Sequence, residues 1–158
     1  MSRIKKVILT LLILFVAIQF IQPARNNNNG QVLATDITKI IPVPDRILDI
    51  LKNSCYDCHS NDSRYPWYSY IQPGAWWMAH HIKEGKQNLN FSEFGSYSSR
   101  KQQNKLRAIG KSIDDGSMPI KPYLIIHSDA KLTREQKVLI QDWVNKTKDS
   151  LSLKNITP

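Results

Sequence analysis

The chain has 158 residues, of which 41% are apolar and only six are glycine, and this composition suffices for one ordinary hydrophobic core. Its formal net charge of +9 overstates the basicity of the central part, because residues 45–147 contain 15 basic and 11 acidic side chains, a balance of +4. So small a surplus is unlike the strongly basic surface of a nucleic-acid-binding protein, and we expect no nucleic-acid partner.

Residues 1–25 are predicted to be a signal or membrane anchor. Basic residues precede a run of 15 residues, 7–21, that only Thr10 and Gln19 interrupt, and a polar stretch follows. This length lies between the apolar core of a signal peptide and the about 20 residues of a full span. No small residues mark a cleavage site, which favours an uncleaved anchor over a cleaved signal. The anchor would hold the chain on the periplasmic side of the bacterial inner membrane, and cleavage would leave it soluble in the periplasm.

Residues 26–43 are predicted to form a linker. The asparagine run that opens this segment cannot build a core, and it is typical of a short tether. Towards the end of the segment Pro42 and Pro44 disfavour a helix, so we expect an extended approach to the domain.

Four segments with helical spacing of apolar residues predict an all-α domain over residues 44–147, followed by a tail, 148–158. No alternating apolar run long enough for a sheet occurs. Two capping boxes, Ser99 to Gln102 and Thr133 to Gln136, mark the starts of the third and fourth helices. The four helices are expected at about 45–55, 73–84, 100–114 and within 131–146.

Both cysteines of the chain, Cys55 and Cys58, stand in a C-x-x-C spacing that His59 follows directly. A zinc site needs about four ligands, and no suitably spaced histidine pair completes this one. A thioredoxin-type redox pair usually begins a helix after a strand, whereas here a helix runs into the motif. A structural disulfide suits an exported chain but leaves His59 unexplained.

C-x-x-C-H is also the attachment motif of c-type haem. In such a site the two thiols add across the vinyl groups of the porphyrin, and the adjacent histidine binds the iron. Export agrees with this interpretation, since covalent attachment of haem follows translocation. The motif therefore predicts one covalently attached haem c on Cys55 and Cys58 with His59 as iron ligand, and it leaves the disulfide, redox-pair and zinc interpretations open as alternatives.

Several motifs resemble known haem proteins. The C-x-x-C-H after a short helix, a Met-Pro pair about sixty residues later and a last helix introduced by "LTREQ" resemble a single-haem, class I cytochrome c. More closely, "CYDCHSNDSRYPWYSYIQP", "WWMAHHIKEGKQNLNFSEF" and "LTREQKVLIQDWV" resemble the small bacterial haem-binding domain family over residues 43–146. The resemblance implies a cytochrome c-like bundle of about four helices around the haem. It also implies thioether bonds at Cys55 and Cys58, His59 as proximal ligand and Met118 as distal ligand.

Two kinds of side chain compete for the second axial position of the iron. Met118 follows the turn sequence "DDGS" and precedes Pro119, which suits a loop that presents one side chain inward. His80 and His81 on the second predicted helix are the rivals, and because adjacent residues lie about 100° apart only one of them can face the haem. We predict Met118, with His81 as the alternative sixth ligand.

An aromatic-rich segment follows the motif. Its rings could cover the porphyrin, or they could simply fill a core. Arg64 in the same stretch could pair with a haem propionate or stay a solvated charge. The two variable positions inside the motif, Tyr56 and Asp57, carry no pattern of their own. The aromatic residues are Tyr65, Trp67, Tyr68, Tyr70, Trp76 and Trp77.

An iron held by histidine and methionine suits one-electron transfer, because its charge changes while its ligands do not. We therefore predict a membrane-tethered or exported electron carrier with redox-protein partners, rather than an enzyme. A haem peroxidase-type module or a haem-based sensor, with an open or histidine-ligated sixth position, is the alternative. On the third helix Arg100, Arg107 and Lys111 share a basic face that could meet an acidic partner, although an ordinary solvated face explains it as well.

Overall fold

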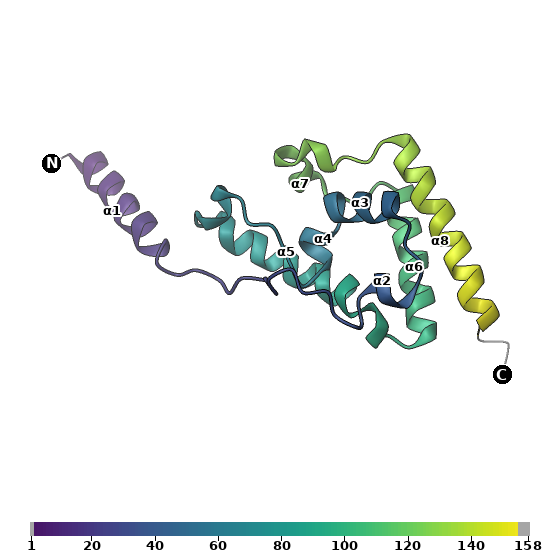
Figure 1. Ribbon diagram of the computed structural model, residues 1–158. Coiled ribbons are helices and arrows are strands. Elements are labelled where there is room, and N and C mark those ends of the chain that lie inside the picture. The colour runs from purple at the N-terminus through teal and green to yellow at the C-terminus, as the bar shows by residue number, and fades with distance from the viewer. Residues whose placement is uncertain (1, 155–158) are drawn as a thin grey trace.

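The structure is a computed structural model that describes residues 2–154, and every regular element in that range is helical (Figure 1). This confirms the predicted all-α fold. The α-helices are α1 (Arg3–Ile18), α2 (Ile37–Ile40), α3 (Asp45–Ser54), α4 (Tyr56–His59), α5 (Gly74–Asn88), α6 (Ser99–Asp114), α7 (Lys121–Ile126) and α8 (Arg134–Lys154). The short 3-10 turns are η1 (Trp67–Tyr70), η2 (Phe91–Ser96) and η3 (Ser128–Ala130).

Helices α6 and α8 pack along each other at one end of the domain (Figure 1). Their apolar stripes meet in the core, as the helical spacing of the sequence predicts. At the crossing Gly110 leaves room for the partner helix, since a Cβ there would lie 2.9 Å from the side-chain oxygen of Gln141. The Gln141 amide donates to the Gly110 carbonyl at 2.6 Å. The stripes comprise Leu106, Ile109 and Ile113 of α6 and Ile140, Trp143 and Val144 of α8.

One of the two predicted capping boxes forms. The Thr133 hydroxyl accepts from the Gln136 amide at 3.1 Å, and the Gln136 side chain accepts from the Thr133 amide at 2.8 Å. The box predicted at Ser99 is wrong, because α6 follows Ser98 as N-cap and no side chain caps its first turn. Gln102 is buried instead, and its amide donates to two carbonyls of the η2 region.

The segment 26–43 differs from the predicted linker, because it packs on the domain. Ile37 and Ile41 are buried in the core, and Asp36 caps the short helix α2. At the start of the segment the Asn26 amide donates to the Ser60 carbonyl at 2.8 Å. Short groups of apolar residues along this segment, among them Ile37 and Ile41, allow it to cover the domain. Its prolines still prevent a long helix.

The predicted tail also differs, since α8 continues to Lys154 and Leu151 packs against the core. Residues 155–158 of that tail lie outside the described residues. At the other end of the chain α1 projects from the domain with none of its residues buried (Figure 1). Within the described range, no helix has both the length and the apolar character needed to cross a membrane.

Candidate functional site

The C-x-x-C-H motif and the Met118 loop meet at a pocket of about 530 Å³. This volume falls within the about 300–1,000 Å³ of small-molecule and cofactor pockets. Its walls come from α4, α5, α6, α7 and the loop between α6 and α7. Every ligand position predicted from the sequence lines it, namely Cys55, Cys58, His59, Met118 and the alternative His81.

A break between two helices presents the motif to the pocket. Helix α3 ends at Ser54, and Cys55 leaves the helical conformation with φ −131° and ψ −38°. The chain then makes the single turn α4, in which the amides of Cys58 and His59 both donate to the Cys55 carbonyl. The two thiols and the imidazole are therefore held by one tight turn.

Both thiols are free and partly buried. Burial raises the pKa of Cys55 to about 12, with a further contribution from Cys58. Burial likewise raises the pKa of Cys58 to about 11, and the charge of Asp57 adds to the effect. Both groups are thus protonated near neutral pH, so neither has the lowered pKa of a reactive thiolate.

His59 is anchored through one ring nitrogen. Its Nδ1 lies 2.9 Å from the Gly85 carbonyl and 3.0 Å from the Leu89 carbonyl, at the end of α5. Carbonyls only accept, so Nδ1 carries the proton and Nε2 keeps its lone pair. Burial lowers the pKa of His59, partly offset by these two hydrogen bonds. A neutral, oriented imidazole of this kind is the usual form of a metal-binding histidine.

Gly85 brings α5 directly against the motif. A Cβ at this position would lie 2.5 Å from the carbonyl oxygen of Cys58 and 3.1 Å from its Cβ, closer than real side chains approach. Only glycine permits this contact, and the contact places the Gly85 carbonyl within reach of His59. This contact explains why a glycine stands at position 85, within the segment "WWMAHHIKEGKQNLNFSEF" that resembles the haem-binding domain family.

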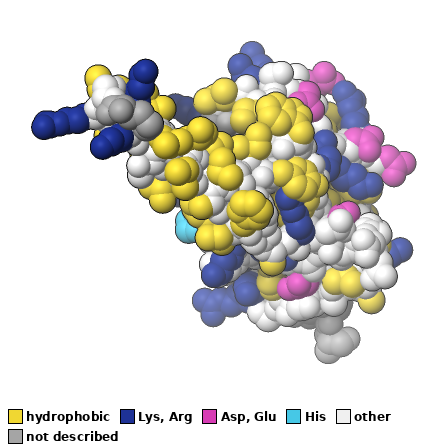
Figure 2. Space-filling model, turned by 90° about the vertical axis from the view of Figure 1, so that its left-hand side faces the viewer, with side chains coloured by type: hydrophobic (Ala, Val, Ile, Leu, Met, Phe, Trp, Pro, Cys, Tyr) yellow, Lys and Arg dark blue, Asp and Glu magenta, His cyan; other side chains and the backbone are white. Residues whose placement is uncertain are grey.

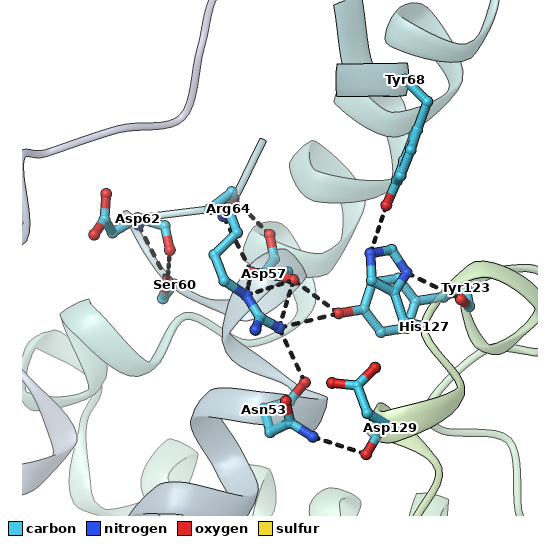
Figure 3. Close-up of polar contacts among 10 residues, drawn as sticks. Asn53, Asp57, Ser60, Asp62, Arg64, Tyr68, Tyr123, His127 and Asp129 are labelled. Carbon is cyan, nitrogen blue, oxygen red and sulfur yellow. Dashed lines mark hydrogen bonds and ion pairs between the residues drawn. The ribbon is translucent and has the colours of Figure 1, made fainter. Parts of the chain in front are cut away.

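Asp57, for which the sequence suggested no role, is buried at the centre of a polar cluster in the pocket wall (Figure 3). Arg64 donates to its carboxylate through Nε at 3.1 Å and through a terminal nitrogen at 3.0 Å. The Tyr123 hydroxyl donates to the same carboxylate at 2.7 Å. The bond to Asp57 raises the pKa of the Arg64 guanidinium. Arg64 is therefore paired with Asp57 at the pocket wall, while its side chain remains half exposed.

The cluster continues from Tyr123 to η1. The ring of Tyr123 stacks on His127 with centroids 4.0 Å apart, and His127 Nε2 lies 2.6 Å from the Tyr68 hydroxyl (Figure 3). Since Tyr123 also lines the pocket, these contacts connect the pocket wall with η1. The sequence could not reveal the connection, because its members are far apart along the chain.

Opposite the motif, Met118 stands on a loop that follows α6. Gly116 turns the chain with a positive φ of 69°, and the Met118 amide donates to the Ser112 carbonyl at 3.2 Å. The Met118 residue is 40% exposed. On α5, His81 lines the pocket with its Nδ1 bonded to the Trp77 carbonyl, whereas His80 is exposed beside Glu84.

Of the two roles that the sequence left open for the aromatic-rich segment, the structure favours neither a pocket wall nor a fully buried core. None of its six rings lines the cavity, whose aromatic residues are Phe91 and Tyr123. Trp67, one of these six aromatic residues, is 75% exposed to solvent. The segment leaves the motif as a loop and begins α5 away from the pocket, so that only the later turns of α5 reach the motif.

An apolar pocket that combines C-x-x-C-H, an oriented neutral histidine and a thioether defines the site of a haem protein. The sequence profile of the family described as a haem-binding domain matches residues 13–146. The chain belongs to this family. The match begins well before residue 43, in keeping with the packing of segment 26–43 on the domain. Neither the curated proteins nor the solved structures yielded a match.

Proposed function

We propose that the chain is a single-haem c-type cytochrome that carries one electron at a time. Cys55 and Cys58 would hold the haem through thioether bonds, and His59 would bind the iron. The orientation of His59 carries the proposal, because its Nδ1–H is committed to two carbonyls while Nε2 remains a base at the pocket. Bound there, the iron supplies a change of charge without a change of ligands.

The protonated thiols suit covalent attachment. Each thiol would add across one vinyl group, so that a sulfur–carbon bond forms and the thiol proton passes to the other vinyl carbon. No oxidant is consumed. The tight turn α4 presents both sulfurs and the imidazole to one cavity, as three attachment points on one porphyrin require.

Retention of the haem after denaturation tests the attachment. Protein produced with export and haem-maturation machinery should keep its haem stain through denaturing electrophoresis, and the variant Cys55→Ser/Cys58→Ser should lose it. The variant Ser54→Ala, beside the motif, is the matched control and should keep the stain. Complete extraction of haem from the wild-type protein by acidified organic solvent would contradict the proposal.

Met118 is the proposed sixth ligand. Its loop is tied to α6 by a backbone hydrogen bond, and its thioether lies at the pocket rather than in the core. A thioether ligand raises the reduction potential, as a carrier late in an electron-transfer chain requires. The ferric protein should then show a weak far-red sulfur-to-iron charge-transfer band, and Met118→Ala should abolish it and lower the potential.

His81 supports a second candidate function. It lines the same pocket, and its Nδ1 is bonded to Trp77, so its Nε2 is also available. A histidine near an open iron would suit a peroxidase-type enzyme or a ligand-exchange sensor. A spectrum that lacks the sulfur band, unchanged in Met118→Ala but altered in His81→Ala, would favour this candidate. His80→Ala is the control, since His80 does not line the pocket.

We further propose that α1 tethers the protein to the periplasmic side of the bacterial inner membrane. The helix exposes apolar side chains on all of its faces, and basic residues stand at its start. Flotation of the exported full-length protein with phospholipid vesicles in a density gradient tests the tether. Recovery of the intact chain only in the soluble fraction would contradict it.

A redox partner with an acidic surface is proposed to dock on α6. Arg100, Arg107 and Lys111 are exposed on this helix, and Lys105 on the same helix lines the pocket. Positive charge beside the cofactor would steer an acidic partner towards it. Electron-transfer rates should fall with added salt and with the change Arg107→Glu, and rates indifferent to both would contradict this docking site.

A further inference from the structure

We propose that the exposed aromatic side chains beside the end of α1 form a membrane-contacting patch that fixes the orientation of the domain on the bilayer. The proposal rests on the tether proposed for α1. The aromatic patch comprises Trp67, Tyr70, Ile71, Trp76 and Trp77, from η1 and the start of α5.

The aromatic patch is a large apolar surface that the pocket does not use. Its five side chains are all exposed, with Trp67 the most so, and none lines the pocket. The side of the molecule that bears α1 shows an extended apolar surface, part of which α1 itself supplies, with basic side chains at its edges (Figure 2). Soluble surfaces rarely gather this many large apolar residues unless they meet a partner or a membrane.

Hydrogen bonds join the aromatic patch directly to the end of α1. The Gln22 amide donates to the Tyr70 carbonyl at 3.1 Å, and the Gln72 backbone amide donates to the Gln19 side chain at 2.9 Å. The Gln72 side chain in turn donates to the Ile21 carbonyl at 2.7 Å. A chain that leaves the membrane through α1 therefore brings this patch, rather than another face of the domain, to the bilayer surface.

The length of α1 favours such close docking. Sixteen helical residues span about 24 Å at 1.5 Å per residue, less than the about 30 Å of a bilayer hydrocarbon core. A short apolar segment draws its flanking groups into the interface. The flanking groups here are Phe20 and Ile21, both exposed, followed in space by the aromatic patch.

The residue types also point to lipid rather than to a protein. Tryptophan and tyrosine concentrate at membrane–water interfaces, where the ring lies among lipid carbons and its polar group meets water. Arg25 lies over the Tyr70 ring at 3.8 Å and over the Tyr65 ring at 4.4 Å, so a cation stands at the edge of the patch. A guanidinium so placed can meet lipid phosphates.

Docking through this patch would also orient the haem pocket. Tyr68 of η1 is bonded to His127, which stacks on Tyr123 of the pocket wall. The patch and the pocket are thus parts of one connected structure, and a fixed patch means a fixed direction for the cofactor and for the basic face of α6. The membrane would then present that face to a partner at a constant height.

The four tryptophans of the chain provide the test, because three lie in the patch and Trp143 is buried on α8 at the opposite end of the domain (Figure 1). The full-length, reduced holoprotein would be labelled with 5-fluorotryptophan and placed in phosphatidylcholine–phosphatidylglycerol nanodiscs. We expect headgroup spin-labelled lipid to remove the fluorine signals of Trp67, Trp76 and Trp77 and to leave that of Trp143. A water-soluble gadolinium chelate should spare all four.

A variant then tests the patch itself. In Trp67→Ser/Ile71→Ser the domain should undock, so that the chelate removes the Trp76 and Trp77 signals. Val138→Ser, a matched change of an exposed apolar residue on α8, should leave both signals protected.

Loss of the Trp67 and Trp77 signals to the chelate, but not to the lipid label, would overturn the proposal because the patch would then face water. Protection from both agents would overturn it as well, since a protein surface such as a second copy of the chain would then cover the patch. Flotation with vesicles reports separately on the tether, and the haem stain reports separately on the cofactor.

Discussion

The two sides of the pocket are built differently. On the motif side, His59 is half-buried, and its Nδ1 is bonded to two carbonyls. Gly85 allows α5 to pack directly against the turn that carries His59. On the other side, Met118 is 40% exposed on a loop that one backbone bond ties to α6. Contacts inside the domain hold the His59 side chain in place, whereas a turn at the surface holds the Met118 side chain.

This difference separates two tasks of an iron site. A ligand locked by packing and hydrogen bonds keeps its geometry through every redox change. A ligand on a surface loop can be exchanged, by evolution or by a competing side chain such as His81, without rebuilding the core. Substitutions on the motif side should therefore lower the free energy of unfolding and the haem content. Substitutions on the loop side should alter mainly which group binds the iron as sixth ligand.

The largest effect is expected from His59→Ala. The change removes the proposed iron ligand, and it leaves the carbonyls of Gly85 and Leu89 without their side-chain donor. The low-spin absorption spectrum should be lost, measured on the purified exported protein alongside its haem content. His80→Ala should leave the spectrum unchanged, because His80 is exposed and does not line the pocket. A low-spin spectrum retained in His59→Ala would contradict the assignment of His59 as the firmly held iron ligand of the pocket.

The second-largest effect is expected from Asp57→Ala, as a loss in the free energy of unfolding. It removes the acceptor of Arg64 and Tyr123 from a position where the Asp57 side chain is only 8% exposed. Arg64 is 56% exposed and can turn to water, so the loss should be about 2–3 kcal/mol rather than that of a fully buried ion pair. Chemical denaturation measures it. Asp62→Ala, an exposed carboxylate nearby, should change the free energy of unfolding by less than about 0.5 kcal/mol.

Gly85→Ala tests the close approach of α5 to the motif. Alanine favours a helix, but its methyl group would meet the Cys58 carbonyl, and overpacking of this kind costs about 1–3 kcal/mol. Denaturation should show the loss. Gly74→Ala is the matched control, because its Cβ would meet only ordinary contact at 3.8 Å. Equal effects at the two glycines would mean that the clash relaxes freely.

Gly116→Ala should have the smallest effect and should act on the other side of the pocket. Nothing lies within 4 Å of a Cβ there, so the cost arises only from the positive φ of 69°, about 1 kcal/mol for a non-glycine residue. Gly116→Asn should cost less, because asparagine tolerates this conformation. Thermal unfolding compares the two variants. A loss in Gly116→Asn as large as that in Gly116→Ala would mean that the loop is held by more than its backbone angle.

The sequence alone determined the features that depend on neighbouring residues. Helical spacing of apolar residues predicted the all-α fold and the stripes of α6 and α8, and the reciprocal pair of Thr133 and Gln136 predicted the start of α8. The C-x-x-C-H spacing predicted a haem site for the same reason, since its chemistry resides in five consecutive residues. Periodicity, caps and short motifs are local interactions, and local interactions can be read directly from the chain.

Only the tertiary structure decided which of these residues face one another. It buried Asp57 against Arg64 and Tyr123, drew segment 26–43 into the core, turned Gln102 inward and left the tryptophans of η1 and α5 outside the pocket. In each case the outcome depends on contacts between residues far apart in the chain, where burial and the pairing of polar groups outweigh local preference. Glycine at position 85 has the same origin, because the space it leaves is filled by Cys58 from another helix.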